Sequence, residues 1–189
     1  MSKKLLAISG GPHDDGATAA MLDCAVRAAK AGGWQVSVVE LYHKHIGFCM
    51  GCRKCDEIGH CVLNDDIREI EKLIKTCDRV VLAAPTYWAN VPAAVKNMFD
   101  RLLGTAMEET GTFPRPRLSS KQEYLLLTAC STPFPFSWMC GQSRGALRAM
   151  NEFFKTAGMK HLGSVTFAGT KGYAKLPART AKRIARYWK

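Results

Sequence analysis

The chain has 189 residues, of which 47% are apolar, values typical of one globular domain, which we place at residues 1–189. No apolar run approaches the roughly 20 residues needed to span a bilayer, and the short run after the N-terminal lysines suits a buried strand better than a signal peptide, so we expect a cytoplasmic protein with no membrane segment. Lys and Arg number 27 against 16 Asp and Glu, and this charge of +11 favours anionic partners or simply gives a well-solvated basic surface.

Apolar runs and helical patterns alternate along the chain. In chain order they predict a strand at Lys4–Ile8, a helix at Ala17–Ala31, a strand at Gln35–Leu41, a helix on the apolar stripe Ile67–Ile74, a strand at Arg79–Ala84 and a helix from Pro92 to Leu103 that Gly104 ends. There follow a strand at Tyr124–Thr128, a helix at Gly145–Ala157, a strand at Ser164–Ala168 and a basic helix at Ala178–Trp188. This alternation predicts an α/β fold, a three-layer sandwich with a five-stranded parallel sheet in the flavodoxin-like order 2-1-3-4-5.

Three irregular stretches break the alternation, at Tyr42–Asn64, Thr105–Gln122 and Ser131–Gly141. Long loops in a compact domain are usually functional or disordered. Ligands of such folds bind at the carboxyl ends of the strands, so we expect a binding site where these loops gather.

A glycine-rich turn joins the first strand to the first helix and predicts an anion site. Its glycines let backbone N–H groups approach an anion, and the helix N-terminus adds about half a positive charge. Ser9 and Thr18 add hydroxyl donors, whereas Asp14 and Asp15 oppose an anion unless they point to solvent or cap the helix. The spacing matches neither the NAD nor the ATP fingerprint, and an ordinary strand-to-helix turn is the alternative.

The third strand ends in an aromatic loop, Pro85-Thr86-Tyr87-Trp88-Ala89-Asn90-Val91. Tyr87 and Trp88 can stack on a planar heteroaromatic ring, while backbone amides and Asn90 address its polar edge. The alternative is an aromatic plug over the end of the core. Two such loops on adjacent strands favour one shared ligand.

Four of the eight cysteines lie close together in the pattern C-x2-C-x2-C-x5-C, at Cys49, Cys52, Cys55 and Cys61. Four thiolates so close can surround a cubane iron–sulfur cluster or a tetrahedral zinc ion. Zinc usually takes two separated pairs, so the spacing favours iron–sulfur. Cys24 and Cys77 fall on helical patterns and are expected to be buried, and Cys130 lies near the expected ligand with its role open.

These motifs resemble the NAD(P)H-dependent FMN reductase family, most closely its iron–sulfur flavoprotein branch. The resemblance lies within residues 4–130 and is carried by Cys49-Met50-Gly51-Cys52, Gly59–Ile67, Pro85-Thr86-Tyr87-Trp88 and Lys96–Arg101. It implies noncovalently bound FMN, NAD(P)H as the donor and a homodimer or homotetramer. The resemblance alone leaves two alternatives for the four cysteines: a 4Fe-4S cluster or, as in relatives without metal, thiols that line the flavin site or a subunit contact.

Transferred by position, the resemblance puts the FMN phosphate on the turn Gly10–Thr18, where Gly11, His13 and Ala17 replace the usual serine, arginine and asparagine. The ring and ribityl contacts fall on Pro85–Val91, and the third flavin loop falls on Thr128–Thr132. No catalytic side chain is expected, because the flavin carries the chemistry. The predicted FMN-binding residues are Ser9, Gly11, Pro12, His13, Gly16, Ala17, Thr18, Pro85, Thr86, Tyr87, Trp88, Asn90, Val91 and Ser131.

Three functions follow from these features. The first is NAD(P)H-dependent reduction of a flavin, quinone or other small acceptor, with Phe134–Met139 lining the donor or acceptor pocket or forming an oligomer interface. The second is an iron–sulfur flavoprotein that exchanges electrons with a ferredoxin-like protein, whose acidity would suit the positive charge. The third is a basic nucleic-acid-binding domain that uses the helix Arg179–Lys189.

Overall fold

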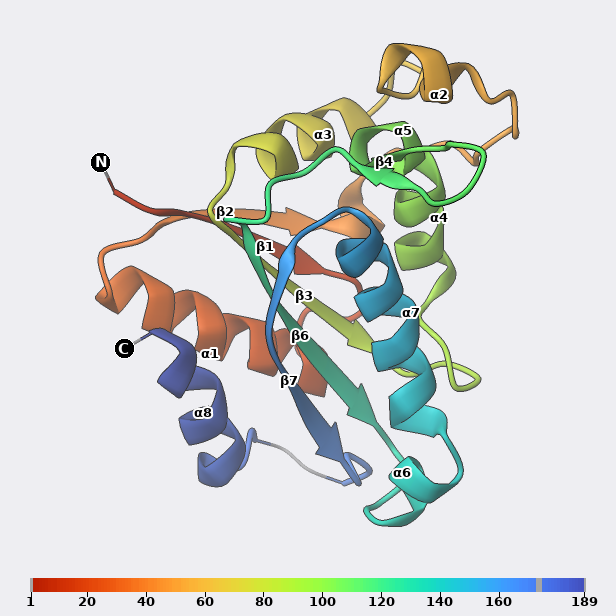
Figure 1. Cartoon of the computed structure of the whole chain (residues 1–189). Helices are drawn as coiled ribbons and strands as arrows, with labels where there is room; N and C mark the ends of the chain where they lie inside the picture. The colour runs from red at the N-terminus through yellow and green to blue at the C-terminus, as the bar shows by residue number, and fades with distance from the viewer. Residues whose placement is uncertain (1, 173–174, 189) are drawn as a thin grey trace.

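A central sheet of five parallel strands organises the molecule (Figure 1). The computed structural model describes residues 2–172 and 175–188. Met1 and Lys189, the two ends of the expected domain, therefore lie outside the described residues, as does the last residue of the expected helix Arg179–Lys189. The order β2-β1-β3-β6-β7 confirms the predicted flavodoxin-like arrangement. The strands are β1 (Lys4–Ser9), β2 (Gln35–Glu40), β3 (Arg79–Pro85), β6 (Glu123–Cys130) and β7 (Lys160–Ala168).

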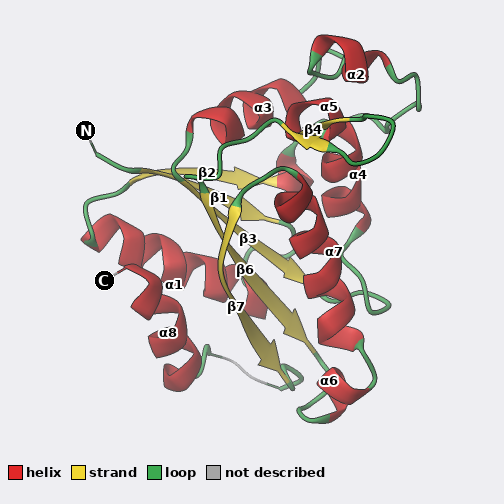
Figure 2. Ribbon diagram, viewed as in Figure 1, coloured by secondary structure: helices red, strands yellow, loops and turns green. Residues whose placement is uncertain are grey.

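Helices cover both faces of this sheet (Figure 2). One face carries α1 (Ala17–Ala31) and α8 (Ala178–Ala185), and the other carries α3 (Ile67–Thr76), α4 (Ala93–Arg101) and α7 (Gln142–Thr156). Successive side chains of a strand point to opposite faces, so Val80 and Leu82 join one apolar cluster while Val81 joins the other. Burial on both faces explains why β3 is almost continuously apolar.

The chain after α8 is fastened to the amino end of the sheet by a buried arginine. A short 3-10 helix, η2 (Arg186–Trp188), follows α8. The Arg79 guanidinium lies 4.6 Å from the ring centre of Trp34 and 4.9 Å from that of Trp188, and it forms an ion pair with Glu123. Arg79 also donates a hydrogen bond of 2.7 Å to the Tyr187 carbonyl. These contacts hold α8 against the face of the sheet that α1 covers.

Five sequence expectations need correction. Gly104 does not end a helix, because it lies inside the short helix α5 (Leu103–Ala106), and α7 begins at Gln142 rather than at Gly145. The stretch 42–64 contains α2 (Lys54–Ile58) after the 3-10 helix η1 (Leu41–His43), and 131–141 contains α6 (Phe136–Met139). The stretch 105–122 contains an antiparallel pair, β4 (Met107–Glu108) and β5 (Arg115–Pro116). In the described part of the chain, each helix is too short or too polar to cross a bilayer.

Candidate functional site

A pocket of about 230 Å³ lies at the carboxyl ends of β1, β3 and β6. Three loops that are far apart in the sequence meet there, and each of them was expected to contact FMN. The predicted residues that line the pocket are Gly11, Pro12, His13, Gly16, Ala17, Thr18, Pro85, Thr86, Tyr87 and Ser131. Ala129, Cys130 and Thr170 complete the lining. The loops therefore form one common pocket, as the switch-point rule predicts.

The turn after β1 brings backbone close to the pocket. Gly10 donates a hydrogen bond of 2.8 Å to the Ala83 carbonyl of β3, and a Cβ there would lie 2.4 Å from Val95 Cγ2, so the position requires glycine. Gly16 caps α1 in an extended conformation without a side-chain hydrogen bond. The first N–H groups of α1 thus lack a side-chain cap on the side of the pocket, which suits an anion.

Threonines fasten the ends of β3 and β6 to each other. The Thr86 N–H donates to the Ala129 carbonyl at 2.9 Å, and the Thr86 and Thr128 hydroxyls are 3.2 Å apart. The Thr128 hydroxyl also donates to the Ala84 carbonyl at 2.9 Å. On the other side, the Thr170 N–H donates to the Cys130 carbonyl at 3.2 Å. These hydrogen bonds fix the spacing between the pocket walls.

A tight hairpin at Tyr87–Asn90 directs the aromatic side chains differently from the expectation. Tyr87 and Asn90 exchange two backbone hydrogen bonds of 2.9 Å, and Trp88 and Ala89 between them have φ angles of 50° and 55°. Such a two-residue turn needs positive φ at both positions. Tyr87 lines the pocket, whereas Trp88 is fully exposed and lies outside it.

Asn90, Val91 and Ser9 also lie outside the pocket. The Asn90 side-chain oxygen accepts a hydrogen bond of 2.8 Å from the Val91 N–H, so it stabilises the hairpin, and Val91 belongs to the core. Ser9 lies in a neighbouring pocket together with Asp14 and Glu40. Ala129 falls within the expected third loop, Thr128–Thr132, whereas sequence reasoning missed Thr170, although the switch-point rule also covers it, since β7 ends beside β6.

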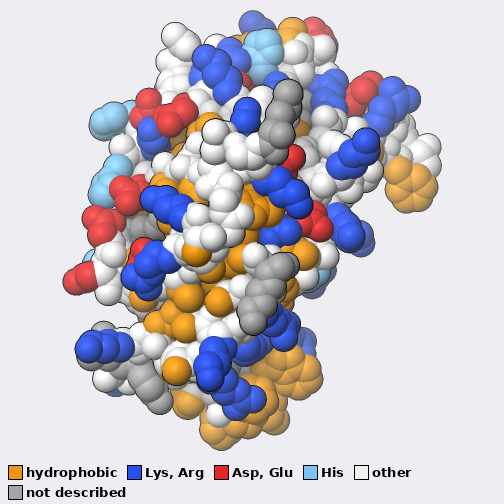
Figure 3. All heavy atoms as spheres, turned by 90° about the vertical axis from the view of Figure 1, so that its left-hand side faces the viewer, with side chains coloured by type: hydrophobic (Ala, Val, Ile, Leu, Met, Phe, Trp, Pro, Cys, Tyr) orange, Lys and Arg blue, Asp and Glu red, His pale blue; other side chains and the backbone are white. Residues whose placement is uncertain are grey.

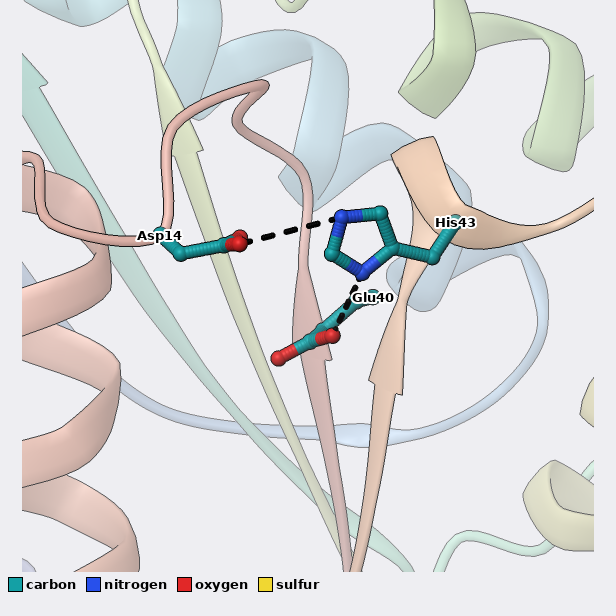
Figure 4. A group of neighbouring side chains, drawn as sticks. All are labelled: Asp14, Glu40 and His43. Atoms are coloured by element: carbon teal, nitrogen blue, oxygen red, sulfur yellow. Dashed lines mark hydrogen bonds and ion pairs between the residues drawn. The ribbon is translucent and has the colours of Figure 1, made fainter.

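His43 lies between Asp14 and Glu40, beside the pocket (Figure 4). His43 Nε2 lies 3.7 Å from an Asp14 carboxylate oxygen, and His43 Nδ1 lies 2.7 Å from Glu40. Figure 4 shows the two carboxylates approaching opposite nitrogens of one imidazole ring. Asp15 is exposed to solvent. The arrangement meets the condition for an anion site, because neither acidic side chain of the turn lines the pocket.

Cys130, whose role the sequence left open, lines the pocket from the end of β6. Burial raises the pKa of its thiol, and hydrogen bonds with Ser137, Thr132 and Gly169 only partly oppose this effect. The thiol therefore stays protonated at neutral pH and presents a neutral wall to the ligand.

The cysteine segment, residues 42–64, is held by two arginines. Arg101, at 1% exposure, forms an ion pair with Asp65 at 2.8 Å and donates to the Gly47 carbonyl and, at 3.2 Å, to Cys61 Sγ. Arg117 donates to the carbonyls of Gly104 at 2.8 Å and Asp56 at 3.0 Å. A Cβ on Gly104 would lie 2.3 Å from the Cys55 carbonyl oxygen, so that glycine permits α2 to pack on α5.

The four cysteines are gathered on this segment, with Cys49 and Cys52 exposed and Cys55 and Cys61 partly buried. Thiolates bound to one zinc ion at about 2.3 Å would be within roughly 4 Å of one another. Among residues 2–172 and 175–188, a group of three metal-ligating side chains with donor atoms within 4.8 Å occurs at Asp14, Glu40 and His43, and none of the four cysteines belongs to such a group. In the described residues, the four thiols are thus not already assembled around one metal position.

The model of the family described as NADPH-dependent FMN reductase matches residues 3–122 of this chain. The chain belongs to this family. The match includes the β1–α1 turn, the cysteine segment and the β3 loop, so the family resemblance expected from the motifs is confirmed.

Curated relatives support the iron–sulfur flavoprotein branch. The chain is 38% identical over 100 residues to a protein of Archaeoglobus fulgidus named "Iron-sulfur flavoprotein", covering 53% of this chain and 46% of that one. A protein of the same name from Methanosarcina thermophila is 32% identical over 98 residues, covering 52% and 51%. The aligned part thus spans about half the length of the curated relatives.

Solved structures confirm the flavodoxin-like fold. An NAD(P)H:quinone oxidoreductase from Methanothermobacter marburgensis superposes with a TM-score of 0.81 at 16% identity, covering 100% of this chain and 98% of that one. An FMN-dependent NADH-azoreductase from Bacillus anthracis, in complex with FMN, superposes with a TM-score of 0.72 at 17% identity, covering 98% and 97%. At such identities the likeness concerns the fold alone.

Proposed function

We propose that this protein is an FMN-dependent oxidoreductase that accepts a hydride from NADPH or NADH and reduces a small acceptor such as a flavin or a quinone. The observation that carries the proposal is the convergence of three loops on one pocket at the carboxyl ends of β1, β3 and β6. Membership of the NADPH-dependent FMN reductase family supports the same function. A homodimer or homotetramer is the assembly we propose, following the family.

Each wall of the pocket has a chemical role in this proposal. The N-terminus of α1, the Thr18 hydroxyl and the His13 ring would hold the phosphate of FMN, while Asp14 lies outside the pocket lining, beside His43. Thr86 and Tyr87 would contact the ring, and the protonated Cys130 thiol would leave the ring environment uncharged. Bound FMN accepts a hydride and returns electrons singly or in pairs.

A pair of matched threonine variants tests the FMN site. Thr18 is buried and lines the pocket. Thr76 is the control, because its hydroxyl donates to the Lys72 carbonyl within α3 and lies outside the pocket. We expect Thr18→Val to weaken FMN binding about tenfold, because one hydrogen bond to a charged phosphate is lost, and Thr76→Val to leave it unchanged. FMN fluorescence titration measures both. Failure of the purified protein to bind FMN would overturn the proposal, and NADPH-driven bleaching of the bound flavin tests the donor.

The second candidate is an iron–sulfur flavoprotein that carries electrons between a ferredoxin-like protein, a 4Fe-4S cluster and FMN. The specific observation in its favour is the clustering of Cys49, Cys52, Cys55 and Cys61 on one segment, together with the names of the curated relatives. The net charge of +11 suits an acidic protein partner. Iron and sulfide assays after anaerobic purification separate the candidates. We expect Cys52→Ser to lose the cluster and Cys140→Ser, also exposed but outside the segment, to retain it.

A further inference from the structure

A second and larger cavity, of about 690 Å³, lies beside β7, between α6 and α8. Phe134, Ser137 and Trp138 line it from the α6 side, and Arg179, Thr180 and Arg183 line it from α8. It is distinct from the FMN pocket in its lining, although Ser131 of that pocket and Phe134 of this one lie on the same loop. Its volume falls within the range of small-molecule sites, roughly 300–1,000 Å³.

The charge on the α8 wall is positive and uncompensated. Arg179 and Arg183 are four residues apart on one helix, where two like charges repel each other. Within residues 2–172 and 175–188, neither arginine makes a hydrogen bond or an ion pair, and no Asp or Glu lines the cavity. Two guanidinium groups in this arrangement suit a phosphate or carboxylate, which each can bind through two parallel hydrogen bonds.

The opposite wall is aromatic and open to solvent. Phe134 is 75% exposed and Trp138 is 54% exposed, and the Arg144 guanidinium lies 5.0 Å from the Trp138 ring centre. Figure 3 shows hydrophobic side chains gathered at the lower end of the molecule, with Lys and Arg side chains directly beside them. Exposed aromatic rings that border a cavity offer flat apolar faces to a planar ligand.

Both walls together indicate the chemistry of the ligand. We propose that this cavity binds an aromatic anion, with its phosphate or carboxylate on Arg179 and Arg183 and its ring against Phe134 and Trp138. Ser137 on the α6 side and Thr180 on α8, both at least nine-tenths buried, add one hydroxyl group to each wall. The ligand is a nucleotide phosphate or an aromatic carboxylate, and both share this recognition. The proposal stands apart from the FMN site and does not depend on it.

Calorimetric titration of the FMN-loaded protein tests the site, because bound FMN blocks the first pocket against phosphates. The probes are 5′-AMP against adenosine and 1-naphthoate against 1-naphthylmethanol, so that each pair differs by the anionic group. We expect at least one anion to bind about tenfold more tightly than its neutral partner, the effect of roughly one charge-assisted hydrogen bond. Binding of AMP identifies a nucleotide phosphate, and binding of naphthoate identifies an aromatic carboxylate.

Variants of α8 separate recognition from general positive charge. The double variant Arg179→Gln/Arg183→Gln should raise the dissociation constant of the bound probe about tenfold or more. Lys182→Gln is the control: it lies on the same helix but does not line the cavity, and it should change that constant less than about twofold. Trp138→Ala should also weaken binding of the same probe, and it provides the test if the double variant does not fold. Absence of saturable binding, equal binding of the neutral analogues, or equal losses in Lys182→Gln would each overturn the proposal. FMN content, measured in the same samples, reports separately on the FMN site.

Discussion

The pocket that we propose for FMN and the cysteine segment are held in place by different kinds of contact. Backbone hydrogen bonds between strand ends, such as Thr86 to Ala129, fix the pocket. The cysteine segment depends instead on long side chains that reach from outside it, chiefly Arg101 and Arg117. The pocket therefore inherits the stability of the sheet, whereas the segment depends on a few charged groups.

The two kinds of contact give the pocket and the cysteine segment different rigidity. Strand ends in a buried sheet move little, so the pocket is preorganised for a cofactor. The segment offers Cys49 and Cys52 at the surface, with little apolar burial around them. A cluster bound there would add the rigidity that the segment lacks, since metal binding stabilises the folded form of its own site.

The strongest test of this comparison is removal of Arg101. Its side chain is fully buried, so Arg101→Met removes the charged partner of the Asp65 carboxylate and one hydrogen bond to the Gly47 carbonyl. Asp65 then keeps only the hydrogen bonds from the Gly47 and Ile67 N–H groups. We expect the free energy of unfolding to fall by about 3–5 kcal/mol, as for other broken buried ion pairs. Urea denaturation measures it. Arg115→Met, which breaks a mostly exposed pair with Glu108, should cost less than about 1 kcal/mol, and equal costs would contradict the special role of Arg101.

The same ion pair predicts a pH dependence of stability. Burial alone would raise the pKa of Asp65, but hydrogen bonds from Arg101 and from the Gly47 and Ile67 N–H groups outweigh it and lower the pKa below its usual value. The pKa of an Asp in the unfolded chain is about 3.9. The ion pair therefore stabilises the folded state above about pH 4, and this stability is lost as the pH falls through the lower pKa of Asp65 in the folded state. We expect Arg101→Met to lose less stability on acidification than the wild type. Parallel curves between about pH 6 and 3 would refute this linkage.

A smaller effect is expected at the hairpin that carries Tyr87. A Cβ on Gly145 of α7 would lie 1.8 Å from the Ala89 carbonyl oxygen, so Gly145→Ala must displace the hairpin. Alanine in place of glycine stabilises a helix by about 1 kcal/mol, but the overpacking should cost more than that. We therefore expect the free energy of unfolding to fall by about 1–2 kcal/mol. FMN affinity should fall as Tyr87 moves, by about tenfold in a fluorescence titration. Gly111→Ala, where a Cβ meets nothing within 4 Å, is the control and should change neither quantity.

The sheet could be predicted from the sequence because its signals are local. The helix Ala17–Ala31 has the bounds that its alanine-rich pattern and following glycines indicated, and the strand order followed from the number of apolar runs. Most of the pocket residues followed as well, since strand ends in this fold meet at one edge.

The remaining features depend on contacts that no local pattern encodes. Trp88 is exposed on a turn whose Ala89 carbonyl packs closely on Gly145, and this turn lacks the Asn-Gly or Asp-Gly pair that usually signals it. Gly104 was read as a helix stop, but its lack of a side chain admits the Cys55 carbonyl. Both glycines serve close approaches between segments distant in sequence, which become visible only in the folded chain.

The smallest predicted effect concerns His43, where the pocket and the cysteine segment meet. His43 belongs to the start of that segment, and its Nε2 lies 3.7 Å from Asp14 of the β1–α1 turn. His43→Ala should release the Asp14 carboxylate toward the phosphate of FMN and raise the dissociation constant about two- to fivefold at low salt, since exposed charges interact weakly. The double variant His43→Ala/Asp14→Asn should bind FMN as the wild type does, and about 0.5 M salt should remove the difference by screening. A loss that persists in the double variant would mean that His43 acts through the backbone of the turn, and the pocket would then depend on the cysteine segment for its shape as well as for its charge.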